Sequence, residues 1–338
     1  MLKILNRKII FIYVLILILL FLLFFFSLTY DLSGGISLLD ALRALFNVGD
    51  ENIITIIKSI RLKRIIMICV TGAALGGSGC VFQAILKNPL ADSFTLGISG
   101  GAALGAALVF ISGFAEVAGF FVPLFAFAGA AISVFTVYIF GFKMKFDSNV
   151  MILSGVIVSY TFSSLVMLIF ALSQPTGVQQ SFVWLTGNFS TFDERLMPFV
   201  VTIVIVGLAI LSLSGSIIDV ISLGYEKSET LGNNIEKNIK IIFLITSLII
   251  ASVVSVCGII GFVGLMVPHI MRNFVGTRSM FLIPASVFGG ALFLLLCDTL
   301  SKIVFAPVVI PPGVITSVFG GVFFVFLLLR KKSSIWYK

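Results

Sequence analysis

Apolar runs of about 20 residues, separated by short polar breaks, recur from Ile9 to Leu329 and constrain this chain more than any other feature. A run of that length crosses a bilayer as a helix, whereas barrel strands would alternate apolar and polar residues. In lipid every backbone polar group needs an internal partner, and a helix supplies it. With 59% hydrophobic and 11% charged residues, the chain is too apolar for a soluble domain. The sequence therefore predicts an all-α polytopic membrane protein.

The runs predict ten crossings within a single transmembrane domain, residues 1–338. They lie at about 9–28, 65–86, 96–112, 120–142, 150–172, 196–213, 241–257, 260–274, 281–296 and 313–329. The first run exceeds the core of a signal peptide and no A-x-A cleavage site follows, so we interpret it as a crossing. The polar loop after it contains an amphipathic stretch, Leu38 to Phe46, which predicts a short surface helix. The core of the domain is expected at 61–330.

Basic residues gather at the ends of the crossings that alternating topology places in the cytoplasm, which predicts cytoplasmic amino and carboxyl termini. The same bias explains the net charge of +8, because no polar domain exists to carry a nucleic-acid-binding face. Arg61, Lys63 and Arg64 break the pattern, since they fall on the outer side before crossing two. We interpret this basic cluster as functional. The alternative is that its side chains merely extend to the membrane interface.

Glycine-rich stretches flank the polar break at 87–89, and small side chains let helix backbones approach closely in lipid. Gly79 precedes Pro89 by ten residues, and Gly258 precedes Pro268 by ten. Crossing two would run inward and crossing seven outward. This spacing predicts two inverted repeats, a common plan among transporters, although a chain with 31 glycines could contain it by chance.

No catalytic or metal-binding constellation is evident in the sequence. The single histidine, His269, lacks partners at ligand spacing, and no P-loop motif occurs. The four cysteines lie in apolar segments without a CxxC motif, which indicates packing. Acidic residues are scarce within the crossings, and the clearest, Asp298, lies at the outer end of crossing nine. This scarcity argues against proton or sodium coupling, so another protein must supply the energy.

The longest polar stretch, 214–240, is expected on the cytoplasmic side and contains an amphipathic unit at 223–232 with a glycine near each end. Glycine commonly ends helices. The unit predicts a short helix lying across the inner face, where a soluble partner could push on it. The alternative is a solvated loop helix without a partner.

Four stretches together resemble the membrane permeases of iron-chelate and vitamin B12 importers, the FecCD-type family of ATP-binding cassette (ABC) transporters: residues 61–108, 223–232, 258–272 and 310–316. The resemblance covers about 55–330. It implies a type II importer architecture of ten helices, and a homo- or heterodimer with the pathway at its interface. Two ATPase subunits, which hold ATP and magnesium, would bind on the cytoplasmic side. An extracytoplasmic substrate-binding protein would bind on the opposite side. This chain would hold no cofactor of its own.

The resemblance also implies roles for particular residues. Docking of the binding protein is expected at Arg61, Arg64 and Lys302. Coupling to the ATPase is expected at Gly224, Glu226, Glu229 and Gly232. The turns that contain Asn88, Leu90, Asp147 and Ser148 resemble the cytoplasmic gate of the family. The sequence departs from the family pattern at Lys63, where proline is usual, at Lys302, where arginine is expected, and at 277–280, where an acidic–histidine–basic run is common.

We therefore expect a transport subunit, not an enzyme, that moves an iron(III)–siderophore complex across the cytoplasmic membrane. The chain has too few ligands to hold a bare ion. One alternative is import of vitamin B12, haem or molybdate by the same mechanism. Another is an ion-coupled secondary carrier acting alone. An intramembrane enzyme lacks a credible nucleophile–base or metal pair. Membrane lipid is an expected partner and nucleic acid is not.

Overall fold

The computed structural model describes all residues except 1, 31–34, 114–118, 190–191, 224–234, 305–307, 309 and 330–338. The described residues form helices and no strand, which confirms the all-α prediction. The helices are α1 (Leu2–Thr29), α2 (Leu38–Leu45), α3 (Glu51–Thr55), the π-helix η1 (Ile56–Leu62), α4 (Lys63–Ile85), α5 (Ile98–Ile111), α7 (Phe121–Lys143), α8 (Ser148–Ala171), α9 (Pro175–Leu185), the 3-10 helix η2 (Glu194–Leu196), α10 (Met197–Leu213), α11 (Gly215–Ser222), α13 (Ile235–Cys257), α14 (Val263–Val275), α15 (Ser279–Val304) and α16 (Pro312–Leu329).

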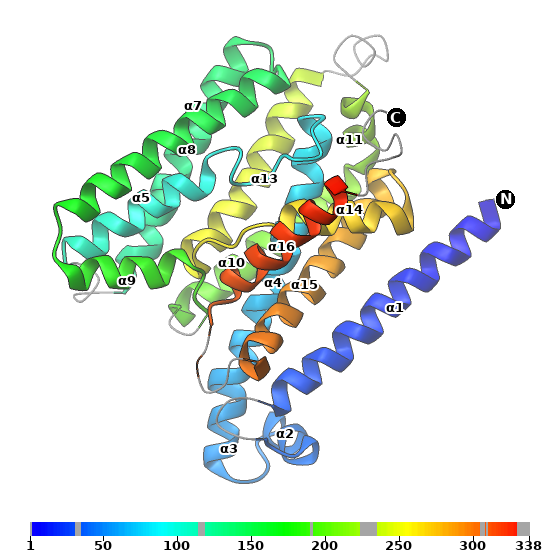
Figure 1. The fold of residues 1–338 in the computed structure, drawn as a ribbon. Helices are drawn as coiled ribbons and strands as arrows, with labels where there is room; N and C mark the ends of the chain where they lie inside the picture. The colour runs from blue at the N-terminus through cyan, green and yellow to red at the C-terminus, as the bar shows by residue number, and fades with distance from the viewer. Residues whose placement is uncertain are drawn as a thin grey trace.

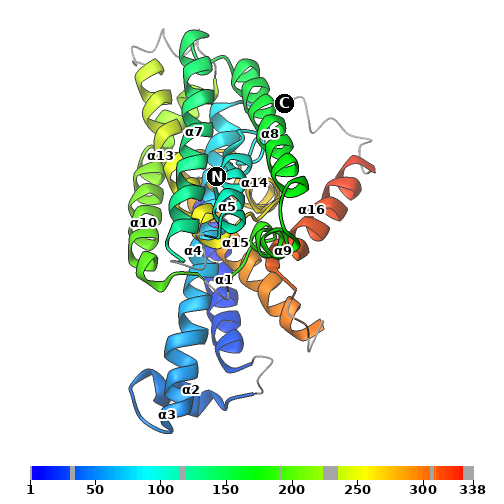
Figure 2. The ribbon, with the colours of Figure 1, turned by 90° about the vertical axis from the view of Figure 1, so that its left-hand side faces the viewer.

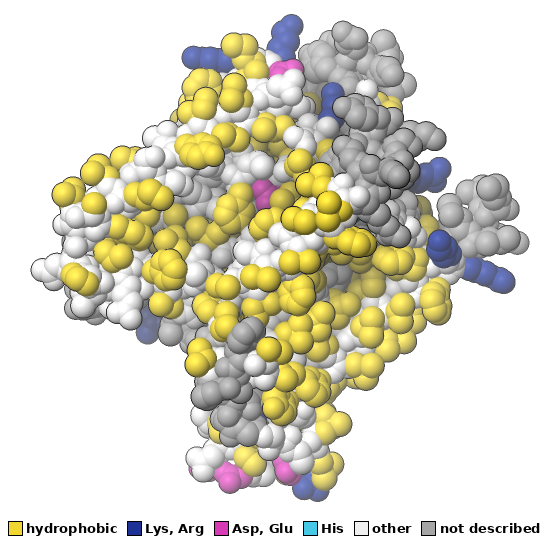
Figure 3. Space-filling view, viewed as in Figure 1, with side chains coloured by type: hydrophobic (Ala, Val, Ile, Leu, Met, Phe, Trp, Pro, Cys, Tyr) yellow, Lys and Arg dark blue, Asp and Glu magenta, His cyan; other side chains and the backbone are white. Residues whose placement is uncertain are grey.

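Eight helices in the described part of the chain are long and apolar enough to cross a membrane. The other two predicted crossings exist as helices but are short, with 14 residues in α5 and 13 in α14. At 1.5 Å per residue such a helix covers about 20 Å, less than the roughly 30 Å hydrocarbon core. The chain is thus a multi-pass membrane protein, and its described residues include eight helices of spanning length and two shorter ones, α5 and α14. Figure 3 shows apolar side chains covering the middle of one face, with charged side chains mainly toward the two ends.

Crossing two begins earlier than predicted, because α3, η1 and α4 form one continuous helix of 35 residues, Glu51–Ile85. The predicted surface helix is present as α2, whose N-cap Ser37 accepts a hydrogen bond from the Asp40 backbone. A 35-residue helix is about 52 Å long and exceeds the membrane thickness. Its outer end therefore projects beyond the other spans together with α2 (Figure 1). The basic cluster at 61–64 lies on this helix and not in a loop.

The packing of the helices supports the predicted inverted repeat. Two units of four helices, α4–α5–α7–α8 and α13–α14–α15–α16, follow each other in the chain, and α4 runs opposite to α13 (Figure 1). The first helix of each unit packs against the third helix of the other, α4 on α15 and α13 on α7. The first helix of each also contacts the other unit's short helix, α4 on α14 and α13 on α5.

The residues that correspond between the two units are not the glycine–proline pairs noted in the sequence. Pro89 lies in the turn after α4, whereas Pro268 lies inside α14. The two units instead correspond in backbone conformation. In each, residues with positive φ stand at both ends of the segment between the long helix and the short helix. In the first unit the segment between the long and short helices begins at Lys87 (φ 47°) and ends at Gly97 (φ 76°). In the second unit the left-handed residues are Gly258 (φ 77°) and Phe262 (φ 66°).

Glycines bring helix backbones into direct contact, as the sequence predicted. A Cβ on Gly72 of α4 would lie 2.3 Å from the carbonyl oxygen of Gly290 in α15. A Cβ on Gly79 would lie 2.1 Å from the Gly264 carbonyl oxygen in α14. No larger residue fits at either position without moving a helix, so these glycines set the helix spacing around the centre of the molecule.

The turns and helix ends that were predicted to be cytoplasmic share one end of the molecule. The start of α1, the turn after α4, the α7–α8 turn, the start of α13 and the end of α16 all point toward the upper part of Figure 1. The helices α2 and α3 lie at the opposite end. We call these the inner and outer ends, following the charge pattern of the sequence.

Candidate functional site

A cavity of about 1160 Å³ opens between α5, α8, α9 and α16. In Figure 2, α16 leans away from α8, and α9 lies at their junction. The wall is mostly apolar, and its polar side chains carry only hydroxyl groups: Thr95, Ser99, Ser159, Tyr160, Ser163, Thr186 and Ser317. Among the described lining residues there is no Asp, Glu, Lys, Arg or His.

The two shorter helices, α5 and α14, begin beside this cavity. Ser99 and Gly100 in the first turn of α5 and Gly261 just before α14 contribute to the wall. The backbone before α5 is non-helical and buried, which lipid would not tolerate but a protein interior does. Asp92 stabilises it, because its Oδ1 accepts hydrogen bonds from the backbone N–H groups of Phe94 and Thr95, each at 3.0 Å. Asp92 was not singled out from the sequence, because its role depends on burial of the segment between α4 and α5 by other helices.

Helix starts leave backbone N–H groups without intrahelical partners and carry a partial positive charge. Transporters commonly aim broken helices at their substrate path near the middle of the membrane. The cavity therefore has hydroxyl groups and two helix N-termini for polar contacts, and apolar side chains elsewhere. No group of three or more His, Cys, Asp or Glu residues that could hold a metal ion occurs in the described chain. The cavity suits a bulky ligand whose metal, if any, is already coordinated.

Large apolar side chains at the edge of this cavity are exposed. Tyr160 is 73% exposed, Met167 71%, Phe182 64% and Val318 62%. They come from α8, α9 and α16, so the cavity is bounded by protein on one side and open on the other. An exposed apolar rim of this kind indicates a surface that meets lipid or another protein.

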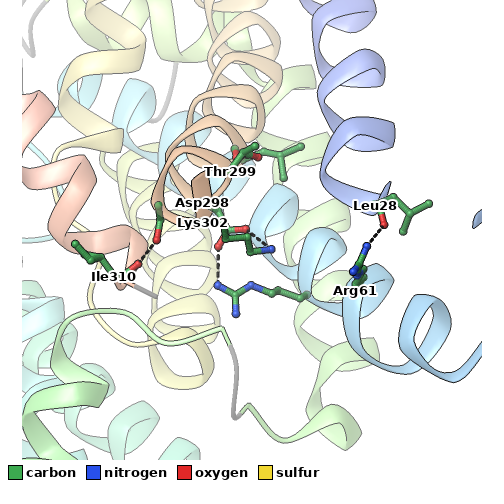
Figure 4. A network of polar contacts seen from close by, with 9 residues as sticks. Leu28, Arg61, Asp298, Thr299, Lys302 and Ile310 are labelled. Atoms are coloured by element: carbon green, nitrogen blue, oxygen red, sulfur yellow. Dashed lines mark hydrogen bonds and ion pairs between the residues drawn. The ribbon is translucent and has the colours of Figure 1, made fainter. Parts of the chain in front are cut away.

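The three residues predicted to dock a binding protein lie near the outer end but do not form one cluster. Arg61 is only 2% exposed and donates hydrogen bonds to the carbonyl oxygens of Leu28 and Thr29, both at 2.9 Å. It therefore ties the long helix to the end of α1. Arg64 instead forms a 2.7 Å ion pair with Asp298 of α15, to which Lys302 is also paired at 3.1 Å. Figure 4 shows Asp298 and Lys302 together on α15, with Arg61 set apart and facing Leu28.

The third basic residue of the 61–64 stretch, Lys63, pairs with Glu194 of η2 and is more accessible, with 34% of its side chain exposed. The sequence placed the basic residues and Asp298 on the same side of the membrane. It could not pair them, because Arg64 and Asp298 are 234 positions apart. That Arg61, Arg64 and Lys302 dock a partner stays a prediction. In the isolated chain the side chains of all three point into the protein interior.

The two turns predicted to form the gate face each other at the inner end. Asn88 Oδ1 accepts a hydrogen bond from the Leu90 backbone at 2.9 Å and shapes the first turn. Asp147 caps α8 by accepting from the Asn149 and Val150 backbones at 3.0 and 3.1 Å. A cavity of about 230 Å³ separates the turns, with Lys87 on one side and Asp147 and Ser148 on the other. Asn88 and Leu90 are not among its lining residues.

The predicted coupling residues Gly224, Glu226, Glu229 and Gly232 lie outside the described residues. The helices on either side of them are described, α11 ending at Ser222 and α13 beginning at Ile235. Ile221 and Ile239 from these two helices line the same 230 Å³ cavity as the gate turns. The two described helices that flank the predicted coupling residues, α11 and α13, therefore both reach the predicted gate.

The remaining residues noted in the sequence have packing environments. The His269 ring stacks edge-on against Phe323 of α16 at a centroid distance of 5.8 Å. Cys80, Cys257 and Cys297 are buried, Cys69 is half-buried, and none of the four is in a disulfide. These surroundings agree with structural roles.

Comparison with known proteins gives a consistent result. Residues 9–330 match the model of the FecCD transport family. The iron(3+)-hydroxamate import permease FhuG of Bacillus subtilis is 31% identical over 87% of this chain and 90% of its own length. The cobalamin import permease BtuC of Halobacterium salinarum is 34% identical over 81% of this chain and 73% of its own. A solved structure of an ABC transporter assigned to the metal-chelate type, in an inward-facing conformation, superposes with a TM-score of 0.83 at 26% identity, covering 98% of this chain and 100% of the other.

Proposed function

The chain belongs to the FecCD transport family and is an ABC importer permease, and we propose that its cargo is an iron(III)–siderophore complex that it carries across the cytoplasmic membrane. Permeases of this family are membrane transport subunits and perform no catalysis themselves. The observation that carries the proposal of a bulky chelate is the wall of the 1160 Å³ cavity, which offers hydroxyl and apolar groups but no charged side chain among its described residues. Such a wall can enclose a large chelate and cannot strip a metal from it.

A cobalamin would also fit a wall of this chemistry, and one relative of 34% identity is a cobalamin permease. Haem and molybdate belong to the same set of alternatives. Molybdate suits this cavity least, because a small oxyanion needs several convergent donors and gains little from an apolar wall. The family match weighs against an ion-coupled carrier acting alone.

The assembly we propose uses three separate surfaces. A second permease subunit, identical or homologous, would cover the exposed apolar rim formed by α8, α9 and α16 and so complete the pathway. Two ATPase subunits would bind the inner end around residues 224–232, and the extracytoplasmic binding protein would bind the outer end near α2, α3 and η2. Both termini would then lie in the cytoplasm, in agreement with the positive-inside tendency.

Coupling to the ATPase is the first of these contacts to test. Glu226→Arg should reduce ATP-driven uptake by about fivefold or more, because it reverses a charge at an interface where ion pairs set orientation. Uptake into vesicles and retention of the ATPase during purification are the measurements. Glu226→Asp, which keeps the negative charge at the same position, is the control and should leave uptake within about twofold of the wild type. Normal uptake by Glu226→Arg would remove residues 224–232 from the coupling mechanism.

The cargo is tested by loading the binding protein that co-purifies with the permease with ferric hydroxamate, ferric citrate, haem or cobalamin. Each loaded form is then offered to vesicles containing the complete importer. We expect ATP-dependent accumulation of a ferric chelate. Accumulation of cobalamin or haem in its place would contradict the iron proposal and leave the family assignment unchanged.

A further inference from the structure

The outer ends of α4 and α15 are joined by a buried charge cluster, Arg64, Asp298 and Lys302. One Asp298 oxygen, Oδ1, accepts from Arg64 at 2.7 Å, and the other, Oδ2, is paired with Lys302 at 3.1 Å. Asp298 is fully buried, whereas 5% of the Lys302 side chain and 13% of the Arg64 side chain are exposed. Arg64 is therefore the member of the cluster that an approaching group reaches first.

The cluster links different parts of the fold. Asp298 and Lys302 lie one turn apart on α15, so their ion pair is local to that helix. The pair between Arg64 and Asp298 joins α15 to α4 across 234 positions of sequence. Loss of the Arg64 contact would leave Asp298 paired with Lys302. The carboxylate would then remain compensated, which lowers the cost of breaking its bond to Arg64.

The same end of α15 is connected to the large cavity. Ser301, next to Lys302, donates a hydrogen bond to the carbonyl oxygen of Ile310 (Figure 4). Two residues later α16 begins, and its first residues Gly313 and Val314 line the cavity. The end of α15 and the short connection to α16 thus link the Arg64–Asp298 contact to the cavity wall.

We propose that Asp298 is an internal substitute for a carboxylate of the docking partner. An acidic residue of the extracytoplasmic binding protein takes over Arg64, Asp298 keeps Lys302, and the outer ends of α4 and α15 are released from each other. This exchange rests on the proposed importer function, since it requires a binding protein. It makes Arg64 a docking residue, Asp298 its competitor, and Lys302 a residue that stays within the subunit.

Competition of this kind has a consequence that a simple docking site lacks. If Asp298 only positions Arg64, then removing its charge should weaken docking. If it competes with the partner, then removing its charge should strengthen docking, because the incoming carboxylate no longer has to displace an ion pair. Asp298→Asn keeps the size of the side chain and removes the charge. We expect it to tighten docking about tenfold, and Arg64→Gln to weaken docking about tenfold or more.

Two further variants separate competition from a general change in charge. Asp298→Asn with Lys302→Met leaves the net charge of the cluster unchanged but still frees Arg64, so it should also bind tighter than the wild type. Glu236→Gln on α13 removes one negative charge at the inner end, away from both the cluster and the proposed docking surface. It should alter docking by less than about twofold, because so distant a charge is screened at physiological salt.

The experiment uses the complete importer in lipid nanodiscs and the full-length binding protein that the wild-type importer retains, with equilibrium docking measured by interferometry. Tighter docking by both Asp298 variants, with weaker docking by Arg64→Gln, supports the exchange. Unchanged or weaker docking by the Asp298 variants overturns it. Failure of Arg64→Gln to fold also overturns it, because docking would break the same contact in the native protein. If the wild type retains no binding protein and shows no ATP-driven uptake, the proposed function itself fails.

Discussion

Gly101→Ala should lower the unfolding midpoint of the permease by about 6–12 °C, while Gly100→Ala on the same helix should shift it by less than about 2 °C. A Cβ on Gly101 would lie 2.2 Å from the Gly129 carbonyl oxygen in α7, a distance that only separation of the two helices could relieve. A Cβ on Gly100 would lie 3.4 Å from the nearest atom, Ser159 Cα, which is an ordinary contact. The two substitutions therefore share composition, helix and propensity, and differ in backbone packing.

Thermal unfolding of the two purified variants, followed by native fluorescence in one detergent, measures this difference. Equal shifts for Gly100→Ala and Gly101→Ala would mean that helix propensity, and not the contact between the α5 and α7 backbones, limits stability at this site. The result would also bear on the contact between Gly72 and Gly290, which has the same geometry.

Ser163→Trp should abolish most transport, lowering uptake about tenfold or more without loss of folded protein. Ser163 lines the 1160 Å³ cavity, and its side chain is exposed, so an indole there has room to enter the space that the cargo needs. The adjacent Ser164 does not line the cavity, and its hydroxyl bonds to the Tyr160 carbonyl oxygen at 2.9 Å. Ser164→Trp should therefore leave uptake within about twofold of the wild type, since tryptophan is tolerated at lipid-facing positions.

Both tryptophan variants are compared by uptake into vesicles that contain equal amounts of assembled importer. ATPase activity without cargo should be the same in the two, because neither residue lies near the inner end. If Ser164→Trp blocked uptake as strongly as Ser163→Trp, the pathway would have to run elsewhere, and the cavity would lose its assigned role.

The sequence was sufficient to predict the helices because hydropathy records the cost of placing polar backbone and side chains in lipid. It placed α5 and α14 within three residues of their observed ends, but counted both as crossings although neither is long enough to span the bilayer. It also left 87–95 outside the crossings without predicting the turn that Asp92 and Thr95 form there. Such a turn depends on burial by other helices, and a single stretch of sequence carries no information about that burial. The start of the long helix was missed for the converse reason, since its outer half is polar and still helical.

The candidate site was predictable to a similar degree. Residues whose roles depend on local turns, such as Asn88 and Asp147, have the hydrogen bonds expected of turn and cap residues. Residues whose roles depend on distant partners were only partly understood. The sequence identified Arg61 and Arg64 as exceptional, but their contacts with Leu28 and Asp298 come from the tertiary fold. The hydroxyl-lined cavity was not predicted, because its residues come from four helices and have no common motif.

The structure also changes the picture of the outer surface. The basic residues at 61–64 suggest, from the sequence alone, exposed charges available to a partner. In the structure Arg61 is buried and Arg64 forms an ion pair with Asp298. The importer can still use Arg64 for docking if a partner competes successfully for it. The energy of docking would then depend on an exchange of ion pairs inside the permease as well as on new contacts at its surface.

We infer that this chain forms a passive pathway whose energy and cargo come from partner proteins. The most direct measurement compares ferric-chelate uptake by vesicles containing the permease alone with uptake by vesicles containing the permease, its ATPase and its loaded binding protein. We expect uptake only in the complete system, and only with hydrolysable ATP, whatever proton or sodium gradient is imposed. Accumulation by the permease alone, driven by an ion gradient without nucleotide, would contradict this account.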